Sequence, residues 1–132
     1  MLKKMLMFVI PILLVVGVTS FYQTKNDGQM CNVTAKDFKE KPKEGAIILD
    51  VRTPAEYQSG HVENAVLMDI SQPTFVEGLK KLDKEKEYYV YCRTGRRSTN
   101  ATQIMKQLGF KKVCNVEGGV LRLTSEGVKL VR

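Results

Sequence analysis

Apolar residues in this chain gather in short blocks separated by polar segments. Mainly apolar runs occur at residues 46–51, 65–68, 88–91 and 112–116, and a shorter one at residues 30–33. Continuous apolar runs of this length are typical of strands that are buried on both faces of a sheet. The pattern therefore predicts five strands.

The segments between these runs carry helix signals. Thr53, Pro54 and Glu56 form a capping sequence that predicts a short helix over residues 53–59. After residue 98, apolar residues recur at helical spacing and predict one buried helix face: Ala101, Ile104, Met105 and Leu108. Further helices are expected at residues 34–38, at residues 74–82 and around Leu121.

Strands and helices thus alternate along the chain, which predicts an α/β domain with a mostly parallel sheet and helices on both faces. In such domains ligands bind beyond the carboxyl ends of the strands. Asp50 and Cys92 both stand at such ends. The length of 132 residues is sufficient for one domain with a single core.

The first residues have the layout of a targeting signal. Lys3 and Lys4 precede a mostly apolar stretch at residues 5–18. This layout predicts a signal peptide or an N-terminal membrane anchor at residues 1–20 and a linker at residues 21–29, which leaves residues 30–132 for the domain. We therefore expect an exported protein, periplasmic or otherwise extracytoplasmic, which is attached to the membrane through residues 1–22 if the segment is an anchor.

The net charge of +7 does not indicate a nucleic-acid-binding protein. Lysines are interspersed with glutamates, as in residues 80–87, and no basic stripe with interleaved aromatic residues is present. We expect no nucleic-acid partner. Cys31, Cys92, Cys114 and His61 contain no closely spaced ligand pair, so no metal site is expected. His61 follows a helix-ending glycine and is expected to be structural.

The candidate chemistry is at Cys92, which ends the aromatic-rich strand and begins a short cationic loop. Backbone amides in such a turn form an anion-binding nest, and the following helix adds partial positive charge. Both effects favour the thiolate, which is the nucleophilic form of cysteine. Candidate substrate-binding residues follow Cys92 directly: Arg93, Thr94, Gly95, Arg96, Arg97 and Ser98.

Several stretches together resemble the rhodanese family of sulfurtransferases. Residues 49–57 with residues 60–65 resemble the first family signature, residues 91–98 the active-site loop, and residues 116–119 the usual ending. The resemblance implies a rhodanese-like domain with a five-stranded, mostly parallel sheet, and a cysteine that carries sulfane sulfur as a persulfide. The chain departs from the family after Gly118-Gly119, where an aromatic residue is common and this chain has Val120, Leu121 and Leu123.

By this resemblance Cys92 would be the catalytic residue of a thiosulfate sulfurtransferase. Its partners would be a small anionic sulfur donor and a thiol or cyanide acceptor, with no cofactor. Asp50 and Arg52 are expected to support the loop through hydrogen bonds. At least one of the three loop arginines is expected to face solvent or pair with a carboxylate.

Two other functions stay open at this point. A rhodanese-like domain can serve as a non-catalytic binding or sulfur-carrier module, because fold does not fix function. A cysteine phosphatase-like enzyme is disfavoured, because the loop has the pattern C-x4-R, one residue shorter than the phosphatase loop.

The remaining two cysteines lie on the first and last predicted strands, which are neighbours if the topology follows the family. We expect Cys31 and Cys114 to be reduced, small buried side chains. A disulfide of an exporting compartment is the alternative.

Overall fold

A computed structural model describes residues 29–41 and 44–132 of the chain. The expected signal or anchor at residues 1–20, and nearly all of the linker, lie outside the described residues. Gln29, which was assigned to the linker, is the first residue of a strand. Within the described part of the chain, no helix has the length and apolar character needed to cross a membrane.

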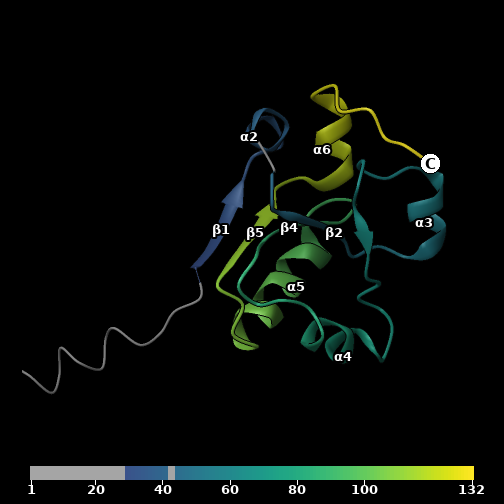
Figure 1. Ribbon diagram of the computed structural model, residues 1–132. Helices are drawn as coiled ribbons and strands as arrows, with labels where there is room; N and C mark the ends of the chain where they lie inside the picture. The colour runs from purple at the N-terminus through teal and green to yellow at the C-terminus, as the bar shows by residue number, and fades with distance from the viewer. Residues whose placement is uncertain (1–28, 42–43) are drawn as a thin grey trace, which may run out of the picture.

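Five strands form one sheet in the order β1-β5-β4-β2-β3, and every neighbouring pair is parallel. Their bounds are β1 Gln29–Val33, β2 Ile47–Asp50, β3 Val66–Leu67, β4 Glu87–Tyr91 and β5 Lys112–Val116. The expected five-stranded α/β fold is confirmed, and the sheet is parallel throughout. Strand β4 is central, so the residue after it lies in the middle of one edge of the sheet (Figure 1).

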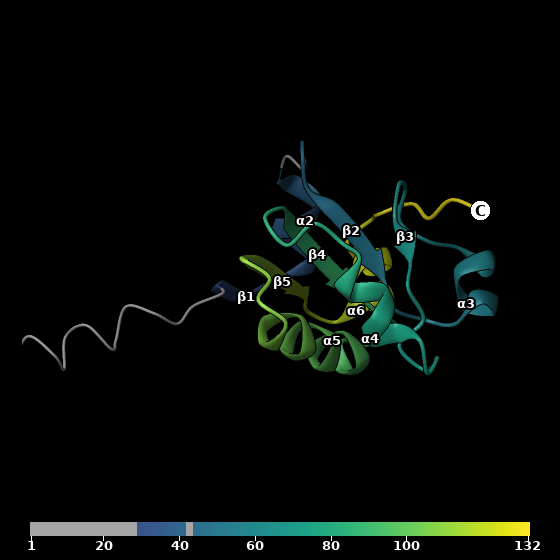
Figure 2. The ribbon, with the colours of Figure 1, turned by 60° about the horizontal axis from the view of Figure 1, so that its bottom comes forward.

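Helices cover both faces of this sheet. Helices α4 and α5 pack on one face, and α2 and α6 pack on the other (Figures 1 and 2). Helix α3 lies at the end of the sheet beyond β3. The helix bounds are α2 Ala35–Glu40, α3 Pro54–Ser59, α4 Phe75–Lys80, α5 Arg96–Gln107 and α6 Gly119–Ser125.

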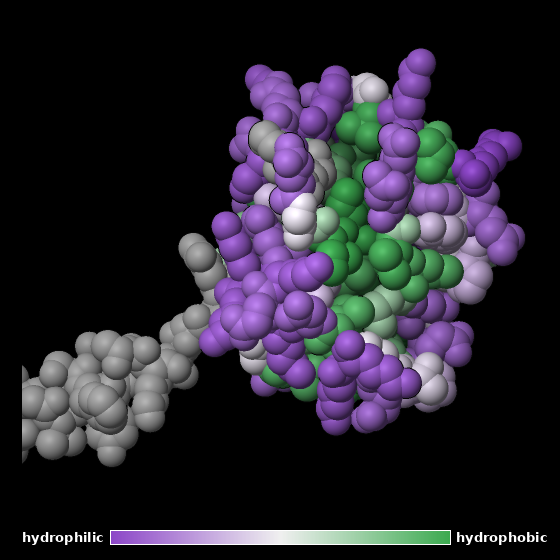
Figure 3. Space-filling view, viewed as in Figure 1, coloured by the Kyte–Doolittle hydropathy of each residue, from purple (hydrophilic) through white to green (hydrophobic). Residues whose placement is uncertain are grey.

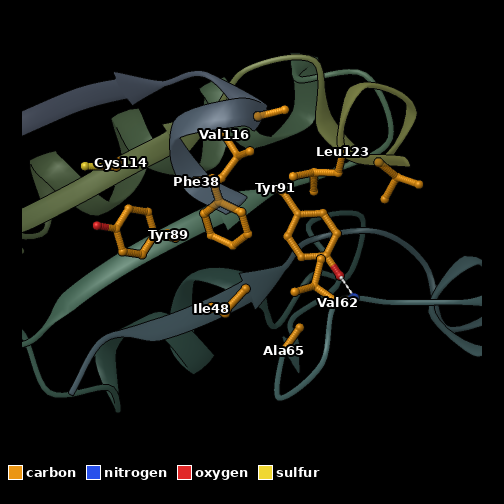
Figure 4. Close-up of a cluster of buried hydrophobic side chains, with 11 residues drawn as sticks. Phe38, Ile48, Val62, Ala65, Tyr89, Tyr91, Cys114, Val116 and Leu123 are labelled. Atoms are coloured by element: carbon orange, nitrogen blue, oxygen red, sulfur yellow. Dashed lines mark hydrogen bonds between the residues drawn. The ribbon is translucent and has the colours of Figure 1, made fainter. Parts of the chain in front are cut away.

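Strand β4 divides the core into two halves, as its continuous apolar sequence predicts. Tyr88 and Val90 pack against α4 and α5, whereas Tyr89 and Tyr91 pack toward α2 and α6. Figure 4 shows the second half, where the Tyr91 hydroxyl accepts a hydrogen bond from the Val62 amide at 2.9 Å. Every side chain from Tyr88 to Tyr91 is almost completely buried, so this strand fixes the position of whatever follows it.

The buried face of α5 is the one predicted from helical spacing. Ala101 and Met105 are completely buried, and Ile104 and Leu108 pack at the edge of the same cluster. This packing anchors α5 beneath the sheet and directs its N-terminus toward the end of β4.

The expectation of two reduced cysteines was wrong: Cys31 and Cys114 form a disulfide. The reason is the register of the edge strand. Parallel pairing of β1 with β5 places Cys31 directly opposite Cys114, with the two Cα atoms 4.5 Å apart, which is within bonding range for a disulfide. Cys92 remains as the free cysteine.

A hollow of about 480 Å³ lies on the α2 side of the sheet, beside β2 and β3. Its lining includes apolar residues from α2, β2 and the C-terminal segment, such as Phe38, Ile48 and Val128. Figure 3 shows apolar side chains gathered in the middle of one face of the domain. Residues 92–98 do not line the hollow, so it is separate from the cysteine loop.

Candidate active site

Cys92 directly follows β4 and is 1 % exposed, so its sulfur lies at the base of the loop that leads to α5. Gly95 allows the chain to reverse there because its φ of 107° is in the left-handed region that favours glycine. Its backbone N–H donates a hydrogen bond to Cys92 Sγ at 3.0 Å. The amide nest expected from the sequence is therefore formed around the sulfur.

Two opposing effects act on the Cys92 thiol. Burial raises its pKa, but hydrogen bonds from the Ser98 hydroxyl and from the Ser98, Gly95 and Thr94 amides lower it, and the net pKa is below the ordinary value. Ser98 Oγ lies 3.5 Å from Sγ and is itself completely buried. The loop thus stabilises negative charge on the sulfur without a neighbouring general base.

Helix α6 holds the cysteine loop from the opposite side. The Val120 amide donates to the Cys92 carbonyl oxygen at 2.9 Å, and the Leu121 amide donates to the Arg93 carbonyl oxygen at 3.1 Å. In a trans peptide the N–H points away from the C=O, so fixing the Arg93 carbonyl on α6 turns the next amide toward the sulfur. The first turn of α6 therefore orients the nest.

Gly119 permits this close approach. Its φ is +56°, and a Cβ atom placed on it would lie 2.5 Å from the carbonyl carbon and oxygen of Arg93, far inside van der Waals contact. From the sequence, the Gly118-Gly119 pair is identified only as part of the usual family ending. Its contact with Cys92 and Arg93 was missed, because the two segments are distant in the chain.

Arg97 does not point freely into the loop. Its guanidinium makes a two-pronged ion pair with Glu56 of α3, with N–O distances of 2.8 and 2.9 Å. The Arg97 hydrogen bonds, supplemented by Thr53 and opposed by partial burial, lower the Glu56 pKa to about 2. One of the three loop arginines is therefore paired with a carboxylate, as expected, and this pair joins α3 to the start of α5.

Glu56 is a site residue that sequence reasoning missed. It was assigned only to the helix cap, which it does form: it accepts a hydrogen bond from the Thr53 amide at 3.2 Å. The cap already accounts for a glutamate at this position, so the sequence carries no separate signal for a partner 41 positions further along the chain.

The other loop residues lie at the mouth of the site. Arg93, Thr94 and Arg96 are exposed, and in the described part of the chain no ion pair engages either arginine. Leu121, at 49 % exposure, also faces solvent beside this loop. The mouth is thus cationic, with an aliphatic side chain near the position where the family commonly has an aromatic one.

Asp50 and Arg52 form a buried ion pair away from the sulfur, with Arg52 Nη2 2.7 Å from Asp50 Oδ2. Tyr91 donates to Asp50 at 2.7 Å, and Arg52 donates to the Gly60 carbonyl oxygen at 2.7 Å. The pair therefore braces the end of β4 and the connection after α3. The support that these residues give the cysteine loop is indirect: Asp50, the last residue of β2, accepts a hydrogen bond from the residue before Cys92, and Arg52 reaches Gly60.

His61 is placed as a structural residue. Its ring stacks on Tyr57 with centroids 3.6 Å apart, and its Nδ1 is 2.9 Å from the Tyr57 carbonyl oxygen. Its backbone pairs with Val131 near the C-terminus. This arrangement leaves Cys92 to depend on the loop amides and the Ser98 hydroxyl.

Several known proteins are similar to this chain over more than half of its length. "Putative sulfur carrier protein YrkF" of Bacillus subtilis is 33% identical over 101 residues, which are 75% of this chain and 54% of the relative. A tRNA uridine(34) hydroxylase of Escherichia fergusonii is 40% identical over 82 residues, 58% of this chain and 23% of the relative. "Probable adenylyltransferase/sulfurtransferase MoeZ" of Mycobacterium tuberculosis is 30% identical over 109 residues, 70% of this chain and 28% of the relative. The chain spans between about a quarter and about half of the length of these relatives.

Solved structures agree with the fold. A rhodanese-related protein from Thermoplasma volcanium superimposes with a TM-score of 0.69 at 34% identity, covering 76% of this chain and 97% of that one. The family profile described as "Rhodanese-like domain" matches residues 34–126, a range that includes Glu56, the cysteine loop and Gly119. The chain therefore belongs to the rhodanese-like domain family, whose members named here include a sulfur carrier and a sulfurtransferase.

Proposed function

We propose that this protein is a sulfurtransferase that takes sulfane sulfur from thiosulfate and passes it to a thiol or cyanide through a persulfide on Cys92. The thiolate attacks the outer sulfur of thiosulfate, a new S–S bond forms, and the S–S bond of the donor breaks. The bonding electron pair leaves with sulfite. The acceptor anion then attacks the outer persulfide sulfur and restores the Cys92 thiolate, so charge and sulfur balance in each step.

The single observation that carries this proposal is the hydrogen bond of 3.0 Å from the Gly95 amide to Cys92 Sγ. A backbone donor directed at Sγ stabilises the Cys92 thiolate, which attacks in the first step and is the leaving group of the second. Because the Cys92 pKa is already lowered by the loop, the attack needs no side chain to remove a proton.

The charges around the loop support an anionic donor. Arg93 and Arg96 are exposed beside the sulfur and have forked donors that match the sulfonate oxygens of thiosulfate. Arg97 is held by Glu56, and its charge interacts with that of Cys92 through space. We assign donor binding to Arg93 and Arg96 with the loop amides of residues 94–98, and charge stabilisation to Arg97.

A sulfur-carrier role is the second candidate, and the observation that favours it is the burial of Cys92. A carrier would receive its sulfur from a partner protein and would turn over small donors slowly. The phosphatase alternative is less consistent with the site, because its loop arginine is needed to enclose phosphate and Arg97 is instead bound to Glu56.

We also propose that the domain works outside the cytoplasm. The positive start and the apolar stretch at residues 5–18 support export. The Cys31–Cys114 disulfide supports it independently, because structural disulfides persist in oxidising compartments. Fractionation of cells that express the full chain tests this location, and recovery of the protein in the cytoplasm would contradict it.

The experiment is a thiosulfate:cyanide assay of thiocyanate formation, with Cys92→Ser as the inactive variant. Wild-type protein should give multiple turnovers and Cys92→Ser none. Activity retained by Cys92→Ser would refute the cysteine mechanism. A single turnover that stops after one sulfur per chain would favour the carrier, and hydrolysis of an aryl phosphate at a comparable rate would favour the phosphatase.

A further inference from the structure

A row of hydrogen-bonded polar side chains leads from the sulfur of Cys92 through the interior to the edge of the sheet. Ser98 Oγ lies 3.5 Å from Cys92 Sγ and 2.5 Å from Asn115 Oδ1, and Asn115 Nδ2 lies 3.1 Å from Asn32 Oδ1. Ser98 is completely buried and Asn115 is 6 % exposed, whereas Asn32 is exposed on β1. This row of side chains therefore has one end at the nucleophile and the other in solvent.

The Ser98 hydroxyl has one proton and several acceptors. As the amides are oriented, Ser98 donates to Asn115 Oδ1, with the Gly95 carbonyl oxygen as a further acceptor at 3.1 Å. While its proton is directed to Asn115, the hydroxyl offers only a lone pair to the sulfur, which suits a Cys92 thiol that donates its S–H. The hydroxyl lowers the Cys92 pKa only when its proton turns toward the sulfur. A thiolate or persulfide has no proton and requires the opposite arrangement.

If the Ser98 hydroxyl donates its hydrogen bond to the sulfur, its oxygen faces the oxygen of Asn115 with no hydrogen between them. A close pair of oxygen acceptors in a buried site is costly. Turning over the Asn115 amide removes this conflict, because Nδ2 then donates to Ser98 and Oδ1 faces Asn32. Asn32 can follow at little cost, since its exposed amide exchanges hydrogen bonds with water.

We propose that Asn115 is a positioning residue for the sulfur chemistry of Cys92, acting through Ser98. By reversing its amide it lets one hydroxyl accept a hydrogen bond from the thiol and donate one to the thiolate or persulfide. The register of β1 against β5 places Asn115 opposite Asn32, next to the Cys31–Cys114 pair. The disulfide therefore holds the outer end of the row of side chains in place. The inference deepens the proposed function, since it concerns the same sulfur.

Alkylation of Cys92 by iodoacetamide as a function of pH tests the inference without any sulfur-transfer assay. Cys92 is the free cysteine, so the midpoint of the rate profile reports its ionisation even if the proposed function fails. Asn115→Asp supplies acceptors only and keeps the Ser98 proton away from sulfur. It should raise the midpoint by about one pH unit.

A double-mutant cycle separates the hydroxyl from the added charge. In a Ser98→Ala background, Asn115→Asp should raise the midpoint by less than about half as much, because the hydroxyl through which it acts is absent. An equal rise in both backgrounds would show a direct charge effect and overturn the proposal. Far-UV circular dichroism confirms that each variant is folded before its profile is measured.

An exposed variant keeps the test usable if the buried one does not fold. Asn32→Asp fixes the outer end as an acceptor and should hold Asn115 in the orientation that keeps the Ser98 hydroxyl from donating to the sulfur. Its midpoint should rise more than that of Asn100→Asp, which makes the same change at an exposed position of α5 outside the chain of hydrogen bonds. Equal shifts in these two variants would contradict the relay.

Discussion

Gly119→Ala tests whether α6 shapes the cysteine loop. The new Cβ would lie 2.5 Å from the Arg93 carbonyl carbon and oxygen, at a φ of +56°. Since these are backbone atoms that directly follow the buried strand β4, we expect α6 to move away and to break its hydrogen bonds with Cys92 and Arg93, which measure 2.9 and 3.1 Å.

The magnitude follows from these contacts. Two hydrogen bonds contribute about 1 kcal/mol each, and a non-glycine residue in the left-handed region costs about 1 kcal/mol or more. The free energy of unfolding should fall by about 3 kcal/mol. Without the anchored carbonyls the loop amides no longer point toward the sulfur. The midpoint of the pH profile of Cys92 alkylation should therefore move to higher pH.

Gly109→Ala is the matched control. Gly109 also has a positive φ, of +95°, but a Cβ atom there would meet nothing closer than a Lys84 side-chain carbon at 3.9 Å. It should lose only the conformational part, about 1 kcal/mol, and keep the alkylation midpoint of the wild type. Thermal unfolding by circular dichroism should place Gly119→Ala about 10 °C below this control. Equal melting temperatures and equal midpoints would refute the role assigned to α6.

Two further predictions concern other links in the structure. Glu56→Gln should lower the free energy of unfolding by about 1 kcal/mol at neutral pH, while Glu77→Gln, which alters an exposed pair with Lys80, should change it by a few tenths at most. Because the Glu56 pKa is lowered from 4.5 to about 2, the stabilisation is present above pH 4.5 and is lost as the pH falls toward 2. The free energies of unfolding of wild type and Glu56→Gln, measured by denaturant titration, should therefore converge near pH 2. A constant difference across that range would contradict the ion pair. Reduction of the Cys31–Cys114 disulfide, which closes a sequence separation of 83 residues, should lower the free energy of unfolding by about 4 kcal/mol and raise the count of reactive thiols in the denatured protein from one to three; three thiols before reduction would contradict the bond.

Local sequence was sufficient for the central part of the site. The apolar run Tyr88 to Tyr91 predicts a strand buried on both faces, and the loop after it predicts an amide nest around Cys92. Both depend only on residues that are adjacent in the chain, together with the helical spacing of Ala101 and Met105. The structure places all of these as expected.

The missed features depend on contacts between distant segments. The Glu56–Arg97 pair joins residues 41 positions apart, and Gly119 reaches Cys92 only once α6 has packed against the sheet. A one-residue slip of β1 against β5 would move Cys31 away from Cys114, so the disulfide could be inferred only from the register. Sequence patterns report which residues are buried, but not which distant residues face one another.

The central claim is that the loop after β4 stabilises a sulfur anion on Cys92 well enough to carry one extra sulfur atom. Intact-mass measurement of the protein after brief treatment with thiosulfate tests it most directly. The account predicts a gain of about 32 Da, localised to Cys92, that disappears on addition of cyanide and is absent from Cys92→Ser. An unchanged mass in the wild type, or the same gain in Cys92→Ser, would contradict it.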